Sequence, residues 1–274
     1  MILHLFSYSE IADICVMNLP FFYIEAFTQT AGKGNPAGVY LLPSALEEAE
    51  MQSIAMERNL PETGFVQRRP DGFSLRWFTP ATELNLCGHG TLAAAHVLWE
   101  QGWLEPGIAA RFHTCAGELM VRLLDDGWIE MDFPAFPLEL SSLPAQVAET
   151  LTPLEVWKTR DRLMVVLGSE AEVREYRPDF ERLRDIELLI TAASDKGAPY
   201  DFVSRTFVVP FGVNEDFVTG SAHCALTPYW SARLGKTSLT AYQASSRGGF
   251  LRVRVEGDRV FIAGQALTLQ PAIA

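Results

Sequence analysis

The chain has 274 residues, which exceeds a typical single domain and suits two domains with a shared interface. It carries 22 Lys and Arg residues against 34 Asp and Glu residues, a formal net charge of −12, so nucleic acid is excluded as the expected partner. Four cysteines without a CxxC spacing favour a cytoplasmic thiol protein over a disulfide framework. The opening segment lacks a basic region and carries Glu10 and Asp13, so neither a signal peptide nor any association with a membrane is expected.

The first predicted elements mix strands and helices. A Gly-, Asn- and Pro-containing stretch predicts a loop over 28–38. Ser44, with Glu47 three residues later, forms a capping box that predicts a helix over 45–58. The turn residues at 70–72 predict a hairpin. Apolar runs rich in aromatic and β-branched residues predict strands at 21–27, 39–42, 62–68 and 73–80.

The remaining elements repeat this mixture. Small apolar residues predict a helix over 91–102 that ends at Gly102, and a second helix over 222–235 that Pro228 kinks. The Pro-rich stretch 134–153 predicts the link between two domains, residues 1–133 and 134–274. In this division residues 1–20 form an extension, and the last strand returns to the first domain. Alternating patterns predict hairpins at 117–133 and 248–264 and strands at 162–168, 187–194 and 202–210.

One pattern occurs twice, 132 residues apart, and indicates an internal duplication. Two similar halves that face each other would place the turns 87–89 and 219–221 on opposite walls of one cleft, with helix N-terminal amides ready for an anion. Glycine at these turns would let the ligand approach the backbone. Aligned without gaps, 83–127 and 215–259 share Glu83 with Glu215, Gly88 with Gly220, Ala93 with Ala225, Gly117 with Gly249, Leu119 with Leu251, Val121 with Val253, Arg122 with Arg254, and Asp126 with Asp258.

Four polar residues beside turns are candidates for chemistry. Glu62 precedes a strand that is expected to be buried, and a carboxyl group shielded from water is suited to move a proton at neutral pH; a solvated turn carboxylate is the other interpretation. His89 and Ser221 occupy equivalent positions in the two repeats and would hold a substrate from opposite sides, although Ser221 would also serve as an N-cap. Asp216 would orient a substrate amine or hydroxyl, or interact with the helix dipole.

Two further patterns are weak signals. Gly32, Lys33 and Gly34 follow a strand, but the spacing differs from a dinucleotide-binding loop and a second strand follows, so no nucleotide cofactor is expected. The cysteine and histidine side chains lack the usual spacing of a zinc site, so no metal is expected. These residues are Cys87, His89, His113, Cys115, His223 and Cys224.

Several stretches resemble the phenazine-biosynthesis PhzF-like family. The resemblance runs from about Phe21 to the end of the chain, and its CGHGT and TGSAH blocks together are specific. The stretches are EAFT with GNPAGV, NLPETGFV, LRWFTPATELNLCGHGTLAAAHVL, DFVSRTFVVPFGVNEDFVTGSAHCALTPYW and QASSRGGFLRVRV. The resemblance implies an α+β fold of the diaminopimelate-epimerase type, with two pseudo-symmetric halves, each a mostly antiparallel barrel-like sheet around a central helix.

The resemblance also implies cofactor-free isomerase chemistry, a small carboxylate substrate and a homodimer. In the phenazine pathway a family glutamate moves a proton between carbons of a dihydro-hydroxyanthranilate, and by motif match that role falls to Glu62. His89, Asp216 and Ser221 would position and polarise the substrate. Backbone amides of the glycine turns would hold its carboxylate, and the further substrate-binding positions are Asn35, Gly88, Gly90, Thr219 and Gly220.

The chain departs from the family pattern in ways that bear on this transfer. Phe217 replaces a proline of the usual EDPxTGS motif, and Pro61 replaces a serine of NLSET. Related racemases use two facing thiols, and Cys87 stands where one would be, with Val218 taken as its counterpart. Cys87 is open to two interpretations, a reactive thiolate at a helix N-terminus or a buried structural cysteine.

Three functional hypotheses follow. The first is a cofactor-independent isomerase that acts on a small cyclic or unsaturated amino or hydroxy carboxylic acid with Glu62 as the acid/base. The second is a one-thiol epimerase or racemase in which Cys87 and Glu62 share the proton transfer. The third is a non-catalytic ligand-binding protein of the same fold.

Overall fold

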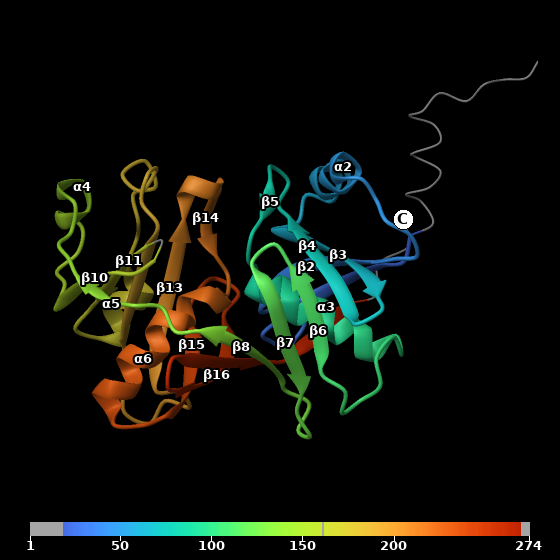
Figure 1. The fold of residues 1–274 in the computed structure, drawn as a ribbon. Coiled ribbons are helices and arrows are strands. Elements are labelled where there is room, and N and C mark those ends of the chain that lie inside the picture. Colours follow the sequence, from blue (N-terminus) through green and yellow to red (C-terminus); the bar gives the residue numbers. More distant parts are fainter. Residues whose placement is uncertain (1–18, 161, 270–274) are drawn as a thin grey trace, which may run out of the picture.

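The computed structural model describes residues 19–160 and 162–269, so most of the predicted extension 1–20 lies outside it. Figure 1 shows two lobes side by side, with β8 at the place where they meet. The helices are α2 (Glu48–Arg58), α3 (Gly88–Glu100), α4 (Ala145–Ala148), α5 (Glu170–Glu175) and α6 (His223–Leu234), with 3-10 turns η1 (Val209–Phe211) and η2 (Gly220–Ala222). None of the helices in these two ranges is long and apolar enough to cross a membrane.

The strands form one continuous set of pairings. Those of the first half are β1 (Phe21–Ala26), β2 (Asn35–Leu42), β3 (Glu62–Arg69), β4 (Gly72–Phe78), β5 (Glu83–Leu84), β6 (Ala110–Thr114), β7 (Gly117–Leu123) and β8 (Ile129–Pro134). Those that follow are β9 (Glu139–Leu140), β10 (Glu155–Lys158), β11 (Leu163–Val166), β12 (Leu188–Ala193), β13 (Phe202–Val208), β14 (Val213–Asp216), β15 (Ser238–Gln243), β16 (Gly249–Glu256), β17 (Arg259–Gly264) and β18 (Ala266–Leu269).

The two halves repeat one pairing pattern. In the first half the neighbours β1–β2, β3–β4, β6–β7 and β7–β8 are antiparallel, and β2–β3 and β4–β6 are parallel. In the second half β10–β11, β12–β13, β15–β16 and β16–β17 are antiparallel, and β11–β12 and β13–β15 are parallel. A helix follows the second strand of each series, α2 in one and α5 in the other. The sequence duplication therefore corresponds to a duplicated topology, and the α+β fold with pseudo-symmetric halves is as expected.

Each half is built around one helix. The N-terminal twelve residues of α3, apart from His96, are buried, and α6 is buried from His223 to Ser231 except at Pro228. A helix that is apolar and small-sided on all faces is stable only inside a core. Accordingly α3 packs on β1, β2, β3 and β8, and α6 packs on β15, β16 and β17. The buried N-termini of both helices bring the two glycine turns into the interior.

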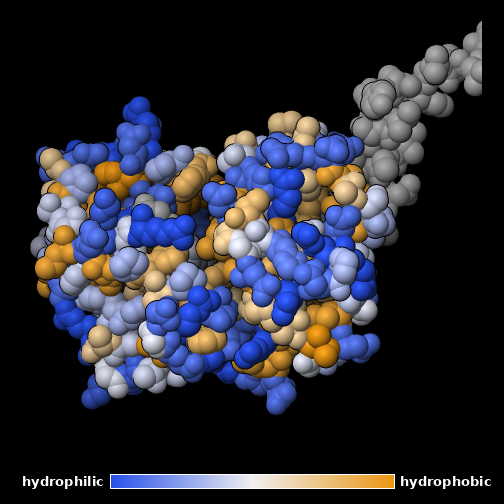
Figure 2. All heavy atoms as spheres, viewed as in Figure 1, coloured by the Kyte–Doolittle hydropathy of each residue, from blue (hydrophilic) through white to orange (hydrophobic). Residues whose placement is uncertain are grey.

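Two pairings join the halves. β8 pairs with β17, in a register that places Phe133 opposite Val260. β18 returns to the first half and pairs with β1, with Ala26 opposite Ala266. One core cluster accordingly contains residues of both halves. Figure 2 shows that the visible face is mostly hydrophilic, with apolar side chains in small groups.

Two sequence predictions are corrected by the structure. The helix α2 begins after Glu47, which forms a capping box with Glu50, and not after Ser44, because the acidic residues offer a second box three residues later. The predicted loop 28–38 ends early, since β2 begins at Asn35, which pairs with Ala26. This second difference matters because it anchors Asn35 at the end of a buried strand.

Candidate active site

Glu62 and His89 form the centre of the site. Glu62 is the first residue of β3 and His89 lies in the first turn of α3, so a strand end and a helix N-terminus meet. A Glu62 carboxylate oxygen contacts Nε2 of His89 as an ion pair. The Glu62 side chain is 14% exposed and that of His89 is 4% exposed. Glu62 is therefore a paired and largely buried carboxylate, not a solvated turn residue, and it is the member of the pair that solvent reaches more easily.

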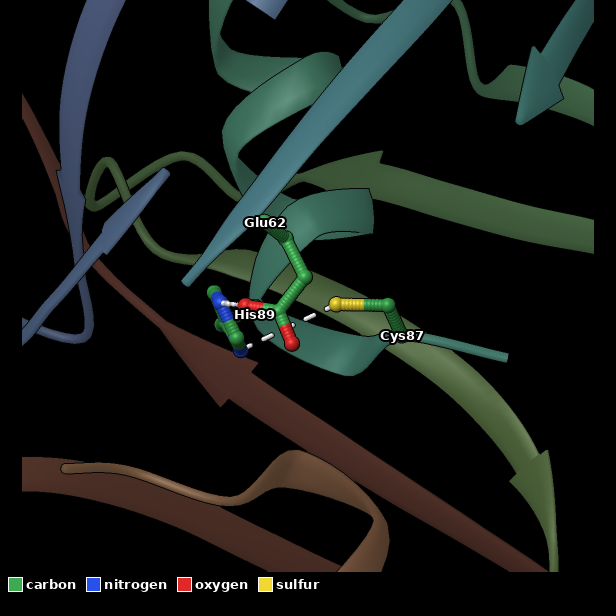
Figure 3. A group of neighbouring side chains, drawn as sticks. All are labelled: Glu62, Cys87 and His89. Atoms are coloured by element: carbon green, nitrogen blue, oxygen red, sulfur yellow. Dashed lines mark hydrogen bonds and ion pairs between the residues drawn. The ribbon is translucent and has the colours of Figure 1, made fainter. Parts of the chain in front are cut away.

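Cys87 lies beside this pair. Figure 3 shows the Glu62 carboxylate between the His89 ring and the Cys87 sulfur. Cys87 is the N-cap of α3, and its sulfur accepts a hydrogen bond from the Gly90 amide at 3.3 Å. The sulfur is 3.8 Å from Nδ1 of His89. The thiol thus has a structural role as a cap and a position next to the candidate acid/base pair.

Asn35 connects the two halves at this point. Its buried side-chain nitrogen donates to Oδ1 of Asp216 at 2.6 Å and to the carbonyl of Val218 at 3.0 Å. The same nitrogen lies 3.2 Å from Nδ1 of His89. An amide nitrogen carries two hydrogens, so these three acceptors compete. The Asn35 amide nitrogen thus lies between His89 of the first half and Asp216 of the second, in contact with both side chains.

Asp216 is held on both carboxylate oxygens. Besides the bond from Asn35, its Oδ2 accepts a hydrogen bond from the Thr219 hydroxyl at 2.7 Å. Gln243, which sequence reasoning did not single out, donates to the Asp216 carbonyl at 2.8 Å and accepts from the Thr219 amide at 2.8 Å. Gln243 opens the QASSRGG stretch, so its place in that motif was the available signal. Asp216 is therefore a fixed carboxylate of β14 and not a residue that acts on the helix dipole.

The two glycine turns contact each other. A Cβ built on Gly88 would lie 3.1 Å from Cα of Gly220, and one built on Gly220 would lie 3.2 Å from Cα of Gly88. The turns face each other as predicted, and the close approach of the opposite backbone favours glycine at both positions. Gly90 is restricted in another way, since its Cβ would lie 2.8 Å from the Trp77 ring and 3.0 Å from the Cys87 sulfur.

The counterpart of Cys87 is Thr219, and the assignment to Val218 is wrong. Cys87 caps α3 and Thr219 caps η2, which leads into α6. The residue four positions on bonds back to each cap: the Thr91 hydroxyl donates to the Cys87 carbonyl at 2.5 Å, and Nδ1 of His223 lies 2.9 Å from the Thr219 carbonyl. This equivalence follows the 132-residue offset of the sequence repeat. The second half therefore has a hydroxyl where the first half has a thiol.

Ser221 is bonded by an arginine that the sequence gave no reason to select. The guanidinium of Arg162 donates to Oγ of Ser221 at 3.4 Å and lies 3.5 Å from a Glu187 carboxylate oxygen. The N-cap positions of η2 and α6 are Thr219 and Ala222, so Ser221 is not a cap. Because Arg162 donates to its oxygen, the Ser221 hydroxyl hydrogen is directed to another acceptor.

The charges of the site are strongly coupled. Burial opposes a charge on His89, but the Cys87 sulfur and the Glu62 carboxylate raise the pKa of this ring well above its ordinary value. Burial also raises the pKa of the Cys87 thiol. Burial raises the pKa of Asp216, although His89 and the bonds from Thr219 and Asn35 oppose that rise. Near neutral pH the raised pKa of His89 favours an imidazolium beside the Glu62 carboxylate.

The same three side chains include every donor type that a zinc ion accepts. Within the two described ranges, Glu62, Cys87 and His89 are a group whose oxygen, sulfur and nitrogen atoms lie within 4.8 Å of one another. A metal would have to displace protons from Cys87 and His89, whose raised pKa values oppose that loss. The other predicted zinc candidates are elsewhere: His113 pairs with Asp71 on the hairpin surface.

Comparison with known proteins shows the family of this chain. A model of the protein family described as "Phenazine biosynthesis-like protein" matches residues 24–272. The chain is 43% identical over 259 residues to an uncharacterized isomerase of Halalkalibacterium halodurans, covering 93% of this chain and 97% of that protein. It is 47% identical over 253 residues to an uncharacterized isomerase of Pseudomonas aeruginosa, covering 92% and 96%.

Solved structures agree in fold. The structure of a phenazine biosynthesis protein of the PhzF family from Enterococcus faecalis matches with a TM-score of 0.86 and 40% identity, covering 92% of this chain and 97% of the other. A "probable proline racemase" from Agrobacterium radiobacter matches with a TM-score of 0.64 at 12% identity, covering 94% of each chain. At 12% identity the second match shows a shared fold alone.

Proposed function

Because this chain belongs to the phenazine biosynthesis-like family and is an isomerase, we propose that it moves a proton on a small cyclic or unsaturated amino or hydroxy carboxylic acid without a cofactor, with Glu62 as the acid/base. The observation that carries this proposal is the contact between Glu62 and His89 at the start of α3. The contact holds the Glu62 carboxyl group beside an imidazole ring, and its partial exposure leaves it open to a substrate.

The proposed reaction is a proton shift. The Glu62 carboxylate takes a hydrogen from one carbon of the substrate as a proton, and the electron pair of the broken C–H bond enters the unsaturated system of the substrate. Glu62 then returns a proton to a different carbon, where a new C–H bond forms. No electrons enter or leave the substrate, so the step needs no redox partner. His89 would stabilise the negative charge of Glu62 and of the substrate while the proton is in transit.

The remaining residues would bind and orient the substrate. Amides at the start of α3 and η2 would hold its carboxylate, as helix N-termini favour anions. Asp216 has both oxygens engaged by Asn35 and Thr219, and it would accept a hydrogen bond from an amine or hydroxyl of the substrate. Ser221 would donate its hydroxyl hydrogen, since Arg162 donates to its oxygen.

The experiment is a proton-transfer assay in deuterated water. Candidate acids, including a dihydro-hydroxyanthranilate, proline and an unsaturated dicarboxylate, are incubated with the protein, and NMR records isomer formation and carbon-bound deuterium. We expect one class of acid to react with the wild type and not with Glu62→Gln. Glu118→Gln is the matched control, since Glu118 is exposed on β7 and pairs only loosely with Arg111, at 3.7 Å. Conversion by Glu62→Gln at the wild-type rate would remove Glu62 from the mechanism.

A one-thiol epimerase is the alternative that a specific observation favours, the 3.8 Å approach of the Cys87 sulfur to His89. In that reaction Cys87 and Glu62 would work on opposite faces of one stereocentre. The raised pKa of Cys87 opposes this role, because the thiolate is the reactive form. Cys87→Ala distinguishes the two: an isomerase that uses Glu62 alone keeps most of its turnover, whereas a one-thiol epimerase loses it.

A further inference from the structure

Arg247 holds the chain segment that precedes Asn35. Its Nε donates to the Gly34 carbonyl at 2.8 Å, and its Nη2 donates to the Lys33 carbonyl at 3.0 Å. The same nitrogen contacts a carboxylate oxygen of Glu25, which lies on β1 and is 2% exposed. One guanidinium from the second half therefore binds two consecutive carbonyls and a buried carboxylate of the first half.

Other contacts fix the same segment to both halves. The second Glu25 oxygen accepts a hydrogen bond from the Gly32 amide at 2.8 Å, and the Gly34 amide donates to the Gly248 carbonyl at 2.8 Å. Gly34 has φ of +66°, and a Cβ there would lie 2.2 Å from the Ala26 carbonyl oxygen. A residue with a side chain does not fit at position 34, so the loop approaches β1 closely and has little freedom.

Arg247 also reaches the Asp216 side of the site. Its guanidinium lies 5.5 Å from the centre of the Phe217 ring. Phe217 is the residue that replaces the proline of the family motif, and it follows Asp216 directly. Ser245 donates to the Phe217 carbonyl at 2.7 Å and accepts a hydrogen bond from the Gly248 amide at 3.1 Å. The 245–248 turn thus contacts the segments on either side of the Asn35–Asp216 bond.

We propose that Arg247 is a positioning residue for Asn35: through Glu25 and the Gly32–Gly34 loop it holds the Asn35 amide between His89 and Asp216. The inference rests on the proposed function for its importance to catalysis, and its geometric part is independent of any substrate. Asn35 follows Gly34 without an intervening residue, so a shift of the loop carries the amide with it. Loss of the guanidinium removes an ion pair from Glu25 and a hydrogen bond from each of two carbonyls.

The test reads the His89 ring directly. The chain has five histidines, so ¹⁵N-histidine NMR resolves each ring, and the ring-nitrogen shifts report the protonation state and the tautomer. We expect Arg247→Gln to change the ring-nitrogen shifts and the titration of His89. Arg252→Gln is the matched control, because Arg252 pairs with Asp126 across the halves at an exposed position and does not contact the loop. We expect it to leave His89 as in the wild type.

A double-mutant cycle tests whether Arg247 acts through Asn35. In an Asn35→Ala background, Arg247→Gln should add no further change to the His89 signals. A folded Arg247→Gln protein with wild-type His89 signals would overturn the proposal. So would an effect of Arg247→Gln that persists in full after Asn35 has been removed. Both outcomes are read without a substrate, so they are distinct from a failure of the proposed isomerisation.

Chemical rescue gives an independent arm. A cavity of about 300 Å³ is lined by Arg247, Lys33, Tyr242 and Phe250, which is room for a small cation. In Arg247→Ala, millimolar methylguanidinium should restore the His89 signals, and methylammonium should not, because only the planar fork serves two acceptors at once. Once a substrate is known, kcat of Arg247→Gln should fall about 10- to 100-fold, the effect of a catalytic group displaced by about 1 Å. Equal rescue by both cations, or by neither, would contradict the positioning role.

Discussion

The two halves share a backbone plan and differ in the chemistry at its centre. Glu62 and Glu187 occupy corresponding positions in the two halves. Glu62 precedes Thr63, which pairs with Phe78 on the next strand, and Glu187 precedes Leu188, which pairs with Phe207 on the next strand. Glu62 faces His89, a partner that can gain and lose a proton. Glu187 faces Arg162, whose planar guanidinium serves as a hydrogen-bond donor.

The same division holds at the glycine turns. Cys87 and His89 of the first half correspond to Thr219 and Ser221 of the second. A thiol and an imidazole can gain or lose a proton, whereas the two hydroxyls serve as hydrogen-bonding groups. Under the proposed function, a substrate between the halves would therefore meet one reactive wall and one binding wall.

The largest expected effect separates the two carboxylates. We expect Glu62→Gln to lower the rate of proton transfer about 10²- to 10⁴-fold, the usual contribution of a general acid/base, with the fold intact. Glu187→Gln should keep the rate within about tenfold but lower the free energy of unfolding by about 1 to 3 kcal/mol, since Arg162 loses a charged partner. Deuterium-exchange rates and urea unfolding curves measure both. Equal rate losses in the two variants would break the division between the halves.

The contributions of the two buried histidines, His89 and His223, to the free energy of unfolding should change with pH in opposite directions. Burial lowers the pKa of His223, in the second half, to about 4. The unfolded chain takes up this proton near pH 6.5, so the stability that neutral His223 contributes is present above 6.5 and is lost as the pH falls to about 4. The loss amounts to about 3 kcal/mol. Urea unfolding of the wild type and of His223→Asn from pH 7 to 4 measures it.

For His89 the sign reverses, because the pKa of its ring is raised. Its contribution is present below pH 6.5 and is lost as the pH rises through the raised value. The difference in unfolding free energy between the wild type and His89→Gln should therefore shrink on the alkaline side. A difference that grows there would show that His89 is buried as a neutral ring.

The glycine contact should be symmetric. We expect Gly88→Ala and Gly220→Ala each to lower the free energy of unfolding by about 1 to 3 kcal/mol, because the new Cβ meets the opposite backbone. Gly64→Ala on β3 is the control, since its Cβ would lie at an ordinary 3.5 Å from Leu75. Thermal unfolding measures all three. A large loss of unfolding free energy in only one of the two variants would mean that the turns do not depend on each other.

The smallest effect concerns the thiol. Cys87→Thr gives the first half the cap residue of the second, and the hydroxyl can still accept from the Gly90 amide. We expect turnover within about tenfold of the wild type and a stability loss of about 1 kcal/mol from altered packing. Stopped assays with the substrate that the NMR experiment identifies measure the turnover of the wild type and of Cys87→Thr. Complete loss of turnover in the folded variant would favour the one-thiol epimerase.

The sequence was sufficient to predict the repeat and its turns, because each copy of the repeat and each turn is a short motif that can be recognised within its own stretch of the chain. Alternation predicted the hairpins that became β7–β8 and β16–β17, and the small-residue runs predicted α3 and α6. The start of α2 was missed because Ser44 and Glu47 each begin a capping-box pattern, and the sequence alone does not show which of the two the helix uses. Asn35 was assigned to a loop because local sequence does not show where the pairing of β2 with β1 begins. Tertiary packing sets that pairing, and it includes Asn35.

The missed site residues share one property, which is that their partners lie on other elements of the fold and are not neighbours in the sequence. Gln243 meets Asp216 and Thr219 only after β15 and β14 join β13. Arg247 meets Glu25 over 222 residues of sequence. Both side chains lie in the QASSRGG stretch, but that stretch does not indicate which residues they contact. Such contacts are set by topology, and a single sequence carries no direct record of them.

The pairing of β18 with β1 has a consequence for how the chain is made. During translation β1 leaves the ribosome long before β18, the strand that covers its edge. The first half therefore waits with two open strand edges, that of β8 for β17 and that of β1 for β18, while the second half is made. Pairings this distant in sequence form slowly. Nascent chains stalled before Ala266 should therefore be more sensitive to protease, and more readily bound by chaperones, than the released protein.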